Sequence, residues 1–348
     1  MRDWAIVGGK HRASAGPSPA CRHPLPEGEG FVPWHRAGFS FSLREKVPEG
    51  RMRVRPKRVV GLRHAFLAAL ALLCVPVLHA TSPETAAPQP QRVVALGGDI
   101  TETVYELGAG QALVGVDSTS LWPEAARKLP DVGYVRQLAA EGVLALRPQL
   151  ILATADAGPP QVIAQLQAAG VRIEKMPVTH TPPEVIAKVR RIGALLGRQG
   201  AAEQLAGKLE SEYAALAAVV AGMTEHPRVV FLLSAGSGSP MAAGRDTAAA
   251  HAIALAGGVN AADGFAGYKP VSAEALVALA PEAIVLMRER AEALGGIEGV
   301  LKLPGVAQTP AGRARRIVFV DGQALLGFGP RNADRELALQ RELAAMRR

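Results

Sequence analysis

The chain has few of the residues that usually mark a disulfide scaffold or a metal site. Only two of its 348 residues are cysteine, Cys21 and Cys74, and both lie within the first 80. The part of the chain after residue 80 therefore has no cysteine nucleophile. Its fold needs no disulfide bonds, which is compatible with an oxidising compartment. Histidine is also scarce beyond residue 80, where only His180, His226 and His251 occur. Their wide separation gives no spacing typical of a zinc or manganese site.

Motifs of common enzyme classes are missing as well. The sequence has no Gly-x-Ser-x-Gly turn and no P-loop. It also offers no grouping of nucleophile, base and orienting residue of the kind that hydrolysis needs. The sequence therefore favours a binding protein over an enzyme.

A nucleic-acid partner is excluded by where the positive charge lies. The formal net charge is +8, but the first 80 residues hold 13 of the 39 Lys and Arg and only 5 of the 31 Asp and Glu. The remaining 268 residues carry 26 of each sign, interspersed. They form no basic stripe that could follow a phosphate backbone.

No apolar run reaches the ~20 residues that a membrane-spanning helix needs. The run at residues 65–78 follows a cluster of basic residues and ends just before Ala80, as in a cleavable signal peptide at residues 52–80. Leu73 before Cys74 argues against a lipoprotein signal. We interpret residues 1–51 as a gene-model extension upstream of Met52, or as disordered. We therefore expect an exported, periplasmic protein.

One passage occurs twice, in residues 133–152 and 267–285, and each copy opens with Gly-Tyr. From Ala140 and Ala273 onward the copies align without a gap at an offset of 133, and the residues are identical at six positions. The duplication predicts two similar lobes with a ligand site between the two Gly-Tyr loops.

Short apolar runs alternate with helical stretches along both halves, which is typical of an α/β fold with mostly parallel sheets. We expect strands at residues 93–96, 113–116, 150–153, 171–176, 229–233, 283–287 and 317–320. We expect helices at residues 100–107, with Asp99 or Thr101 as the cap, at 247–256 and at 273–279. We expect a linker at residues 81–91, lobes at 92–182 and 228–348, and a helical connection at 183–221. Its second half predicts one long interlobe helix, a stiff hinge that permits only a small rocking of the lobes about the cleft.

Tyr134 and Arg136 are the first candidate site residues. They lie in a loop before a short helix, and in an open α/β sheet the loops at the strand carboxyl ends face the ligand crevice. Tyr134 is either a wedge at the lobe interface or, as a phenolate, a hard ligand for ferric iron. Arg136 would stabilise that phenolate or a ligand carboxylate.

The second copy supplies Tyr268 and Lys269, which either line the cleft or are ordinary packing and solvated residues. Arg288 and Arg290 follow the predicted strand 283–287 and should reach the cleft mouth. One of them is expected to bond Tyr134 or an anionic ligand, and the other to be solvated.

Glu141 and Glu274 occupy equivalent positions in the repeat, each at the start of a predicted helix. A carboxylate there is favoured by the helix dipole alone. One acidic side chain on each lobe would also suit docking to a two-fold symmetric membrane partner that presents arginines.

Taken together, several blocks make the chain resemble the periplasmic haemin-binding proteins of bacterial ABC importers, within a wider class of cobalamin and siderophore receptors. The resemblance covers residues 91–348 and is carried by residues 133–142, 243–249, 257–260, 268–270, 294–296, 303–305 and 326–331.

The resemblance implies that haem is the transported ligand, that Tyr134 is the axial ligand to its iron and that Arg136 is a propionate partner. Glu141 and Glu274 would contact an inner-membrane ABC permease dimer, and an outer-membrane uptake system would supply haem to a monomeric protein. Some relatives provide a histidine from the loop that here begins at Ser234, where this chain has none, and Met241 is a weak substitute.

Haem chemistry agrees with this reading. An apolar disc with two carboxylates and a ferric centre needs an apolar slot, cations at its rim and an anionic ligand. A ferric-siderophore or cobalamin receptor is the alternative within the same class. An exported haem-modifying enzyme is the alternative from another class.

Overall fold

The computed structural model describes residues 89–234 and 240–346. The expected signal peptide, residues 1–51, both cysteines and most of the linker lie outside the described residues. Among the helices of the described part, none is long and apolar enough to cross a membrane.

The first lobe is built on a four-stranded, fully parallel sheet in the order β2-β1-β3-β4. Its strands are β1 (Val93–Leu96), β2 (Leu113–Val116), β3 (Leu150–Ala153) and β4 (Arg172–Lys175). The connecting helices are α1 (Gly98–Glu106), η1 (Gly110–Ala112), η2 (Glu124–Lys128), α2 (Ala140–Ala145) and α3 (Pro160–Ala168). Every residue of β1 and β3 is buried, because helices cover both faces of a parallel sheet.

The second lobe has a mixed six-stranded sheet in the order β10-β9-β5-β6-β8, with β7 also paired to β5. The strands are β5 (Arg228–Ser234), β6 (Met241–Ala243), β7 (Val259–Asn260), β8 (Tyr268–Pro270), β9 (Ala283–Met287) and β10 (Ile317–Val320). β6 points in the opposite direction to the other five strands, because its pairings with β5 and β8 are antiparallel and the remaining pairings are parallel. The sequence predicted β5, β9 and β10 but missed β6, β7 and β8, because two or three residues are too few to show a period.

The helices of the second lobe are mostly short. They are α6 (Ala248–Leu255), α7 (Ala273–Ala278), α8 (Arg288–Ala293), α9 (Gly296–Leu301), η3 (Val306–Gln308), α10 (Pro310–Arg313) and α11 (Gly322–Leu326). The sequence predicted α6 and α7 to within a residue or two.

The internal repeat is visible in the backbone. Shifting α2 by 133 residues gives the bounds of α7, and shifting β3 gives the first four residues of β9. The residues between helix and strand, Arg147 and Ala280, are also equivalent, and both have φ of 45°. The expectation of two similar lobes is confirmed.

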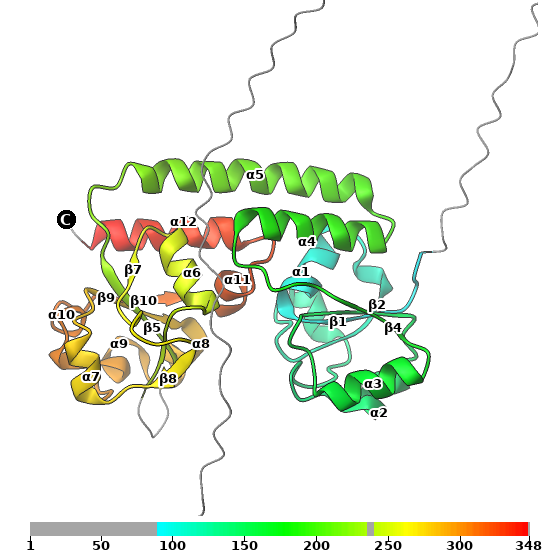
Figure 1. Ribbon diagram of the computed structural model, residues 1–348, viewed down its shortest axis with the longest axis horizontal. Coiled ribbons are helices and arrows are strands. Elements are labelled where there is room, and N and C mark those ends of the chain that lie inside the picture. The colour runs from blue at the N-terminus through cyan, green and yellow to red at the C-terminus, as the bar shows by residue number, and fades with distance from the viewer. Residues whose placement is uncertain (1–88, 235–239, 347–348) are drawn as a thin grey trace, which may run out of the picture. The chain divides into compact units, whose positions relative to one another are not determined.

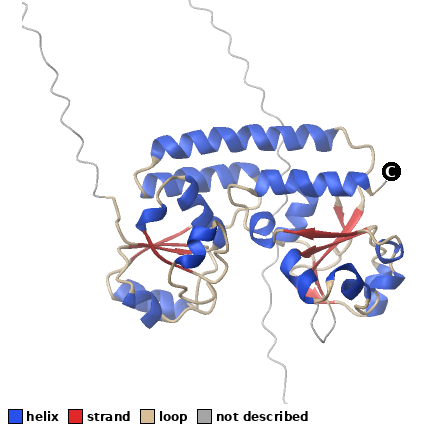
Figure 2. Ribbon diagram, turned by 180° about the vertical axis from the view of Figure 1, so that it is seen from behind, coloured by secondary structure: helices blue, strands red, loops and turns tan. Residues whose placement is uncertain are grey.

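Three helices run alongside one another over the two lobes: α4 (Pro182–Leu195), α5 (Gln199–Ala221) and α12 (Asn332–Ala345). α5 packs against both α4 and α12 (Figures 1 and 2). It is the expected long helix, and its buried face includes Leu205, Leu209, Tyr213 and Leu216. The connection is nevertheless thicker than one helix, because α4 and α12 brace α5.

The start of α1 differs from the expectation. The sequence placed this helix at residues 100–107 with Asp99 or Thr101 as its cap, but it begins at Gly98 and has no side-chain cap. The Asp99 carboxylate instead accepts a 2.5 Å hydrogen bond from the Nζ of Lys188, a buried side chain on α4. A tertiary ion pair has therefore replaced a local cap.

A buried polar cluster joins α5 to α12. The Tyr213 hydroxyl donates to Asn332 Oδ1 at 2.8 Å, and Asn332 Nδ2 donates to Glu336 Oε1 at 3.3 Å. Glu336 is fully buried, and its Oε2 has no partner. Burial raises the pKa of Glu336 well above 4.5, so its carboxyl stays protonated where an exposed glutamate would ionise.

This carboxyl makes stability fall as pH rises. The folded chain keeps a proton that the unfolded chain releases from about pH 4.5 upward. We predict that Glu336→Gln is more stable than wild type at pH 8 by about 1 kcal/mol or more, with the gap narrowing toward pH 5. Urea unfolding at both pH values measures this, with Glu342→Gln, an exposed position on the same helix, as control. The same difference in unfolding free energy between Glu336→Gln and wild type at pH 5 and at pH 8 would contradict this prediction.

Candidate functional site

Exposed apolar and aromatic side chains gather at the carboxyl edge of the first sheet. Seven large side chains of this type are exposed among the described residues, and four of them lie in loops at this edge: Leu121, Trp122, Tyr134 and Val178. Leu121 and Trp122 follow β2, and Val178 follows β4. The carboxyl edge of a parallel sheet is where such folds bind ligands, so this edge is the candidate site.

Tyr134 is brought there by a segment that continues beside β2. Asp131 forms a parallel bridge with Val116, and the Ser118 N–H donates to the Gly133 carbonyl at 3.0 Å. Gly133 has φ of 91°, a backbone conformation that glycine adopts without strain. The chain then turns outward and leaves the Tyr134 side chain 38% exposed.

Arg136 and Asp156 complete a connected group with Tyr134. Nη1 of Arg136 donates a hydrogen bond to the Tyr134 hydroxyl. Nε and Nη2 of Arg136 contact Oδ2 of Asp156 at 2.6 and 2.5 Å. The other carboxylate oxygen, Oδ1, accepts from the Thr154 hydroxyl at 2.8 Å. The sequence singled out Tyr134 and Arg136 but not Asp156 or Thr154.

Both members of the ion pair are charged. Burial alone would raise the pKa of Asp156, but the Thr154 hydrogen bond and the Arg136 charge lower it overall. Burial would likewise lower the pKa of Arg136, but its hydrogen bonds to Tyr134 and Asp156 raise it overall. The Tyr134 hydroxyl therefore lies beside a guanidinium whose charge is partly balanced by a carboxylate.

The second Gly-Tyr copy is placed differently. Tyr268 opens β8 and is half-buried in the core of the second lobe. Burial raises the pKa of Tyr268, against the opposing effects of hydrogen bonds to Ala249 and Thr247 and of the Arg136 charge. Arg136 therefore lies near enough to interact electrostatically with the second lobe. The Lys269 ammonium lies 5.7 Å from the ring centroid of Phe265.

The remaining predicted cleft residues of the second lobe lie near its strand ends. Arg288 begins α8, and its Nη2 donates to the Phe319 carbonyl of β10 at 3.0 Å. Arg290 lies exposed in α8, and the half-buried Met241 opens β6. We expected Arg288 or Arg290 to donate to Tyr134 or to an anionic ligand; the hydrogen bond to the Tyr134 hydroxyl comes from Arg136 instead. Residues 235–239, in the loop after β5, lie outside the described residues.

Glu141 and Glu274 are exposed in the first turns of α2 and α7. Hydrogen bonds from its own N–H and from Ser272 lower the pKa of Glu274. Both helices lie on the side away from α5 (Figure 1). The two carboxylates are thus presented to solvent from equivalent helices.

Two histidines far apart in the sequence meet between the lobes, which sequence reasoning missed. The rings of His180, just before α4, and His251, on α6, are stacked with centroids 4.5 Å apart. The edge of Phe328 packs against His180 at 5.3 Å. Burial, followed by the charge of His251, lowers the pKa of His180, so the His180 ring favours its neutral form.

An ion-pair cluster also joins the lobes. Arg331 contacts Glu102 of α1 and Asp321 beside β10, both at 2.8 Å. Its guanidinium carbon lies 4.6 Å from the Trp122 ring centroid. The Gln323 side chain accepts from the Leu121 N–H at 2.8 Å. These contacts fix Leu121 and Trp122 against the second lobe.

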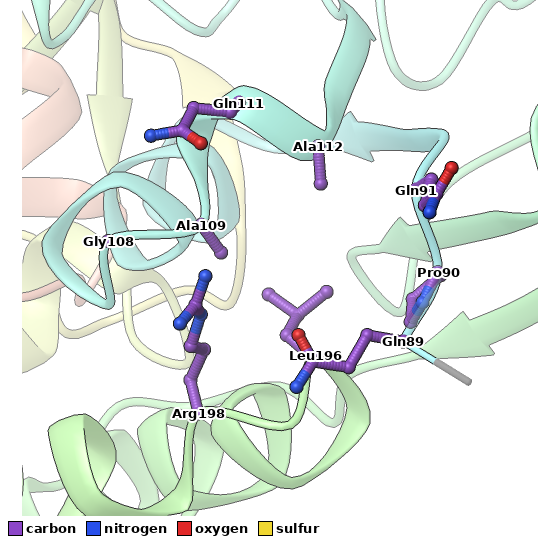
Figure 3. Close-up of a pocket in the computed structure, with 9 residues that line it drawn as sticks. All are labelled: Gln89, Pro90, Gln91, Gly108, Ala109, Gln111, Ala112, Leu196 and Arg198. Carbon is purple, nitrogen blue, oxygen red and sulfur yellow. The ribbon is translucent and has the colours of Figure 1, made fainter. Parts of the chain in front are cut away.

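Two pockets flank opposite edges of the first sheet. One, of about 360 Å³, lies beside Gln91 and Ala112, which lie just before β1 and β2, and is closed by Leu196 and Arg198 (Figure 3). It therefore lies at the amino edge, away from Tyr134. The other, of about 420 Å³, is lined by Leu121, Trp122, Glu124, Arg127 and Lys128. It combines apolar surface with two cations at the carboxyl edge.

Two solved structures similar to this chain are periplasmic heme-binding proteins. The periplasmic heme-binding protein BhuT in complex with two hemes is 40% identical, with a TM-score of 0.70, over 73% of this chain and 98% of that one. The periplasmic heme-binding protein RhuT from Roseiflexus sp. RS-1, in apo form, is also 40% identical, with a TM-score of 0.71, over 74% of this chain and 99% of that one.

A similar protein of known sequence has a different ligand in its name. The cobalamin-binding protein of Halobacterium salinarum is 30% identical over 203 residues, which are 57% of this chain and 54% of that protein. The chain thus matches only about half of its length. Residues 93–324, spanning both sheets and the interlobe helix, match the family described as periplasmic binding protein, and the chain belongs to that family.

Proposed function

We propose that this protein captures ferric haem in the cleft beside Tyr134 and delivers it to an inner-membrane ABC permease. The observation that carries the proposal is the exposed phenol of Tyr134 at the carboxyl edge of the sheet, with Arg136 donating to its hydroxyl. A phenolate is a hard anionic ligand suited to ferric iron. A cationic donor at its oxygen would balance the charge of a phenolate bound to iron.

The surroundings of Tyr134 fit the rest of the haem molecule. Leu121, Trp122 and Val178 offer exposed apolar surface at the same edge for a flat macrocycle. Arg127 and Lys128 line the adjoining pocket and provide cations for carboxylates. Solute receptors of this kind need an apolar slot with a few polar groups that fix orientation.

A cobalamin or ferric-siderophore receptor is the second candidate, and the cobalamin-binding relative is the observation in its favour. Two points favour haem. The heme-binding structures are more similar and match over nearly their full lengths, and cobalamin, whose metal is cobalt, has no need of a phenolate paired with arginine. An enzyme is disfavoured because the family and its solved neighbours are solute-binding proteins.

Ligand titration of the purified chain separates these candidates. We expect haemin to bind with a shifted Soret band, and cyanocobalamin and a ferric siderophore to leave tryptophan fluorescence unchanged at the same concentrations. Trp122 at the candidate site would report their binding. Binding of cobalamin without haemin would overturn the proposal. Unmodified haem recovered after incubation with a reductant would argue against an oxygenase.

We propose further that the protein acts in the periplasm as a monomer, and that Glu141 and Glu274 dock its two lobes on the permease. The support is their equivalent, exposed placement on α2 and α7. Charged pairs across such an interface set register and partner choice.

The docking proposal predicts a loss of transport without a loss of binding. We expect the Glu141→Ala, Glu274→Ala double variant to bind haem like wild type but to lower haem transport by its importer in proteoliposomes by about tenfold or more. Haem transport with each single variant should lie between that of wild type and that of the double variant. Glu292→Ala, an exposed glutamate on α8, is the control. Wild-type transport by the double variant would rule out this docking role.

A further inference from the structure

The Asp156 carboxylate holds the guanidinium of Arg136 from the side opposite Tyr134. Arg136 uses Nε and Nη2 for Asp156 and Nη1 for the Tyr134 hydroxyl, so a single planar group bridges the carboxylate and the phenol. Thr154 fixes the carboxylate in turn, through the 2.8 Å bond to Oδ1. The chain Thr154, Asp156, Arg136, Tyr134 is therefore continuous.

The two loops that carry this chain are tied to each other by their backbones. The Gly158 N–H donates to the Val135 carbonyl at 3.0 Å, and the Leu138 N–H donates to the Gly158 carbonyl at 2.9 Å. The Lys175 ammonium of β4 clamps the carbonyls of Ala155 and Ala157 at 3.1 and 2.9 Å. Asp156 is thus held on a braced loop rather than on a free one.

We propose that Asp156 is a positioning residue for the iron ligand: it orients Arg136 so that the guanidinium donates to the oxygen of Tyr134. This inference rests on the proposed function for its consequence in haem binding. Its geometric part concerns the ligand-free protein alone.

The physical need for such a residue lies in the arginine side chain. The Arg136 side chain is 55% exposed, and an arginine in water samples many rotamers. A carboxylate that accepts from both Nε and Nη2 selects one orientation of the planar fork. That orientation leaves Nη1 directed at the Tyr134 hydroxyl.

A double-mutant cycle tests the coupling. We expect Asp156→Ala to weaken haemin binding about tenfold, the lower end for residues that orient a metal ligand. Asp156→Asn, which keeps one acceptor oxygen, should lose less haemin affinity than Asp156→Ala. In an Arg136→Leu background, Asp156→Ala should cause no further loss, because Asp156 acts through Arg136. Glu203→Gln, which breaks an exposed ion pair with Arg190 on α4, is the matched control.

Two other readouts separate positioning from stability and from the proposed function. In the phenolate-to-iron charge-transfer band, Asp156→Ala should give the same shift as Arg136→Leu. In the ligand-free protein, the Nε–H resonance of Arg136, identified by its loss in Arg136→Lys, should broaden or shift toward that of a free arginine in Asp156→Ala.

Additive losses of haemin affinity in the cycle would overturn the inference. A higher haemin affinity in Asp156→Ala would also overturn it, because it would mean that Asp156 keeps Arg136 away from haem. An unchanged Arg136 resonance would overturn it as well. If wild type failed to bind haemin while the resonance changed as expected, the proposed function would fail and the positioning of Arg136 would stand.

Discussion

Tyr134→Phe is expected to weaken haemin binding by at least about a hundredfold, more than changes around a metal ligand usually cost. The substitution keeps the ring that packs at the sheet edge and removes only the hydroxyl that accepts from Arg136. Without that oxygen the chain has no phenolate at the candidate site to bind ferric iron. Haemin titration, followed in the Soret region, measures the affinity.

Tyr268→Phe is the matched control, because it removes the phenol of the other Gly-Tyr copy. The Tyr268 side chain is half-buried against the core of the second lobe, near Thr247 and Ala249 at the start of α6. We expect the haemin spectrum to survive Tyr268→Phe. If Tyr268→Phe abolished the spectrum and Tyr134→Phe did not, the iron ligand would come from the second lobe.

Lys188→Met should give the largest loss of stability, about 3–5 kcal/mol in the free energy of unfolding. The Lys188 side chain is 2% exposed and pairs with Asp99 at 2.5 Å and with the Thr179 hydroxyl at 2.9 Å. Its removal leaves a buried carboxylate without its cation, and such a charge is strongly destabilising. Urea unfolding followed by circular dichroism measures the change.

Two further variants make this result specific. Asp99→Leu combined with Lys188→Met removes both charges and should recover much of the lost stability. Lys208→Met breaks an exposed pair with Glu212 and should change stability by less than about 1 kcal/mol. Equal losses for Lys188→Met and Lys208→Met would show that burial of the Asp99 pair is unimportant.

Much of the fold was predictable because its signals are local. The buried strands β1, β3 and β9 read as continuous apolar runs, and the repeat at an offset of 133 gave both lobes. The predicted start of α1 was wrong because Asp99 pairs with Lys188, a residue 89 positions away, instead of capping the helix. No local pattern encodes such a contact.

The site was predictable in part for the same reason. Tyr134 and Arg136 are two residues apart, so a loop motif carries both, but Asp156 reaches Arg136 only because the loop after β3 lies beside the Tyr134 loop. The stack of His180 on His251 likewise depends on how the two lobes meet. The sequence contained these residues without any spacing that would pair them.

The most direct measurement is the resonance Raman spectrum of the ferric haemin complex, excited in its charge-transfer band, for wild type and Tyr134→Phe. We predict tyrosinate ring vibrations in wild type that shift when tyrosine is ring-deuterated and vanish in Tyr134→Phe. Persistence of the same vibrations in Tyr134→Phe, or their absence from a wild-type complex that binds haemin tightly, would contradict Tyr134 as the iron ligand.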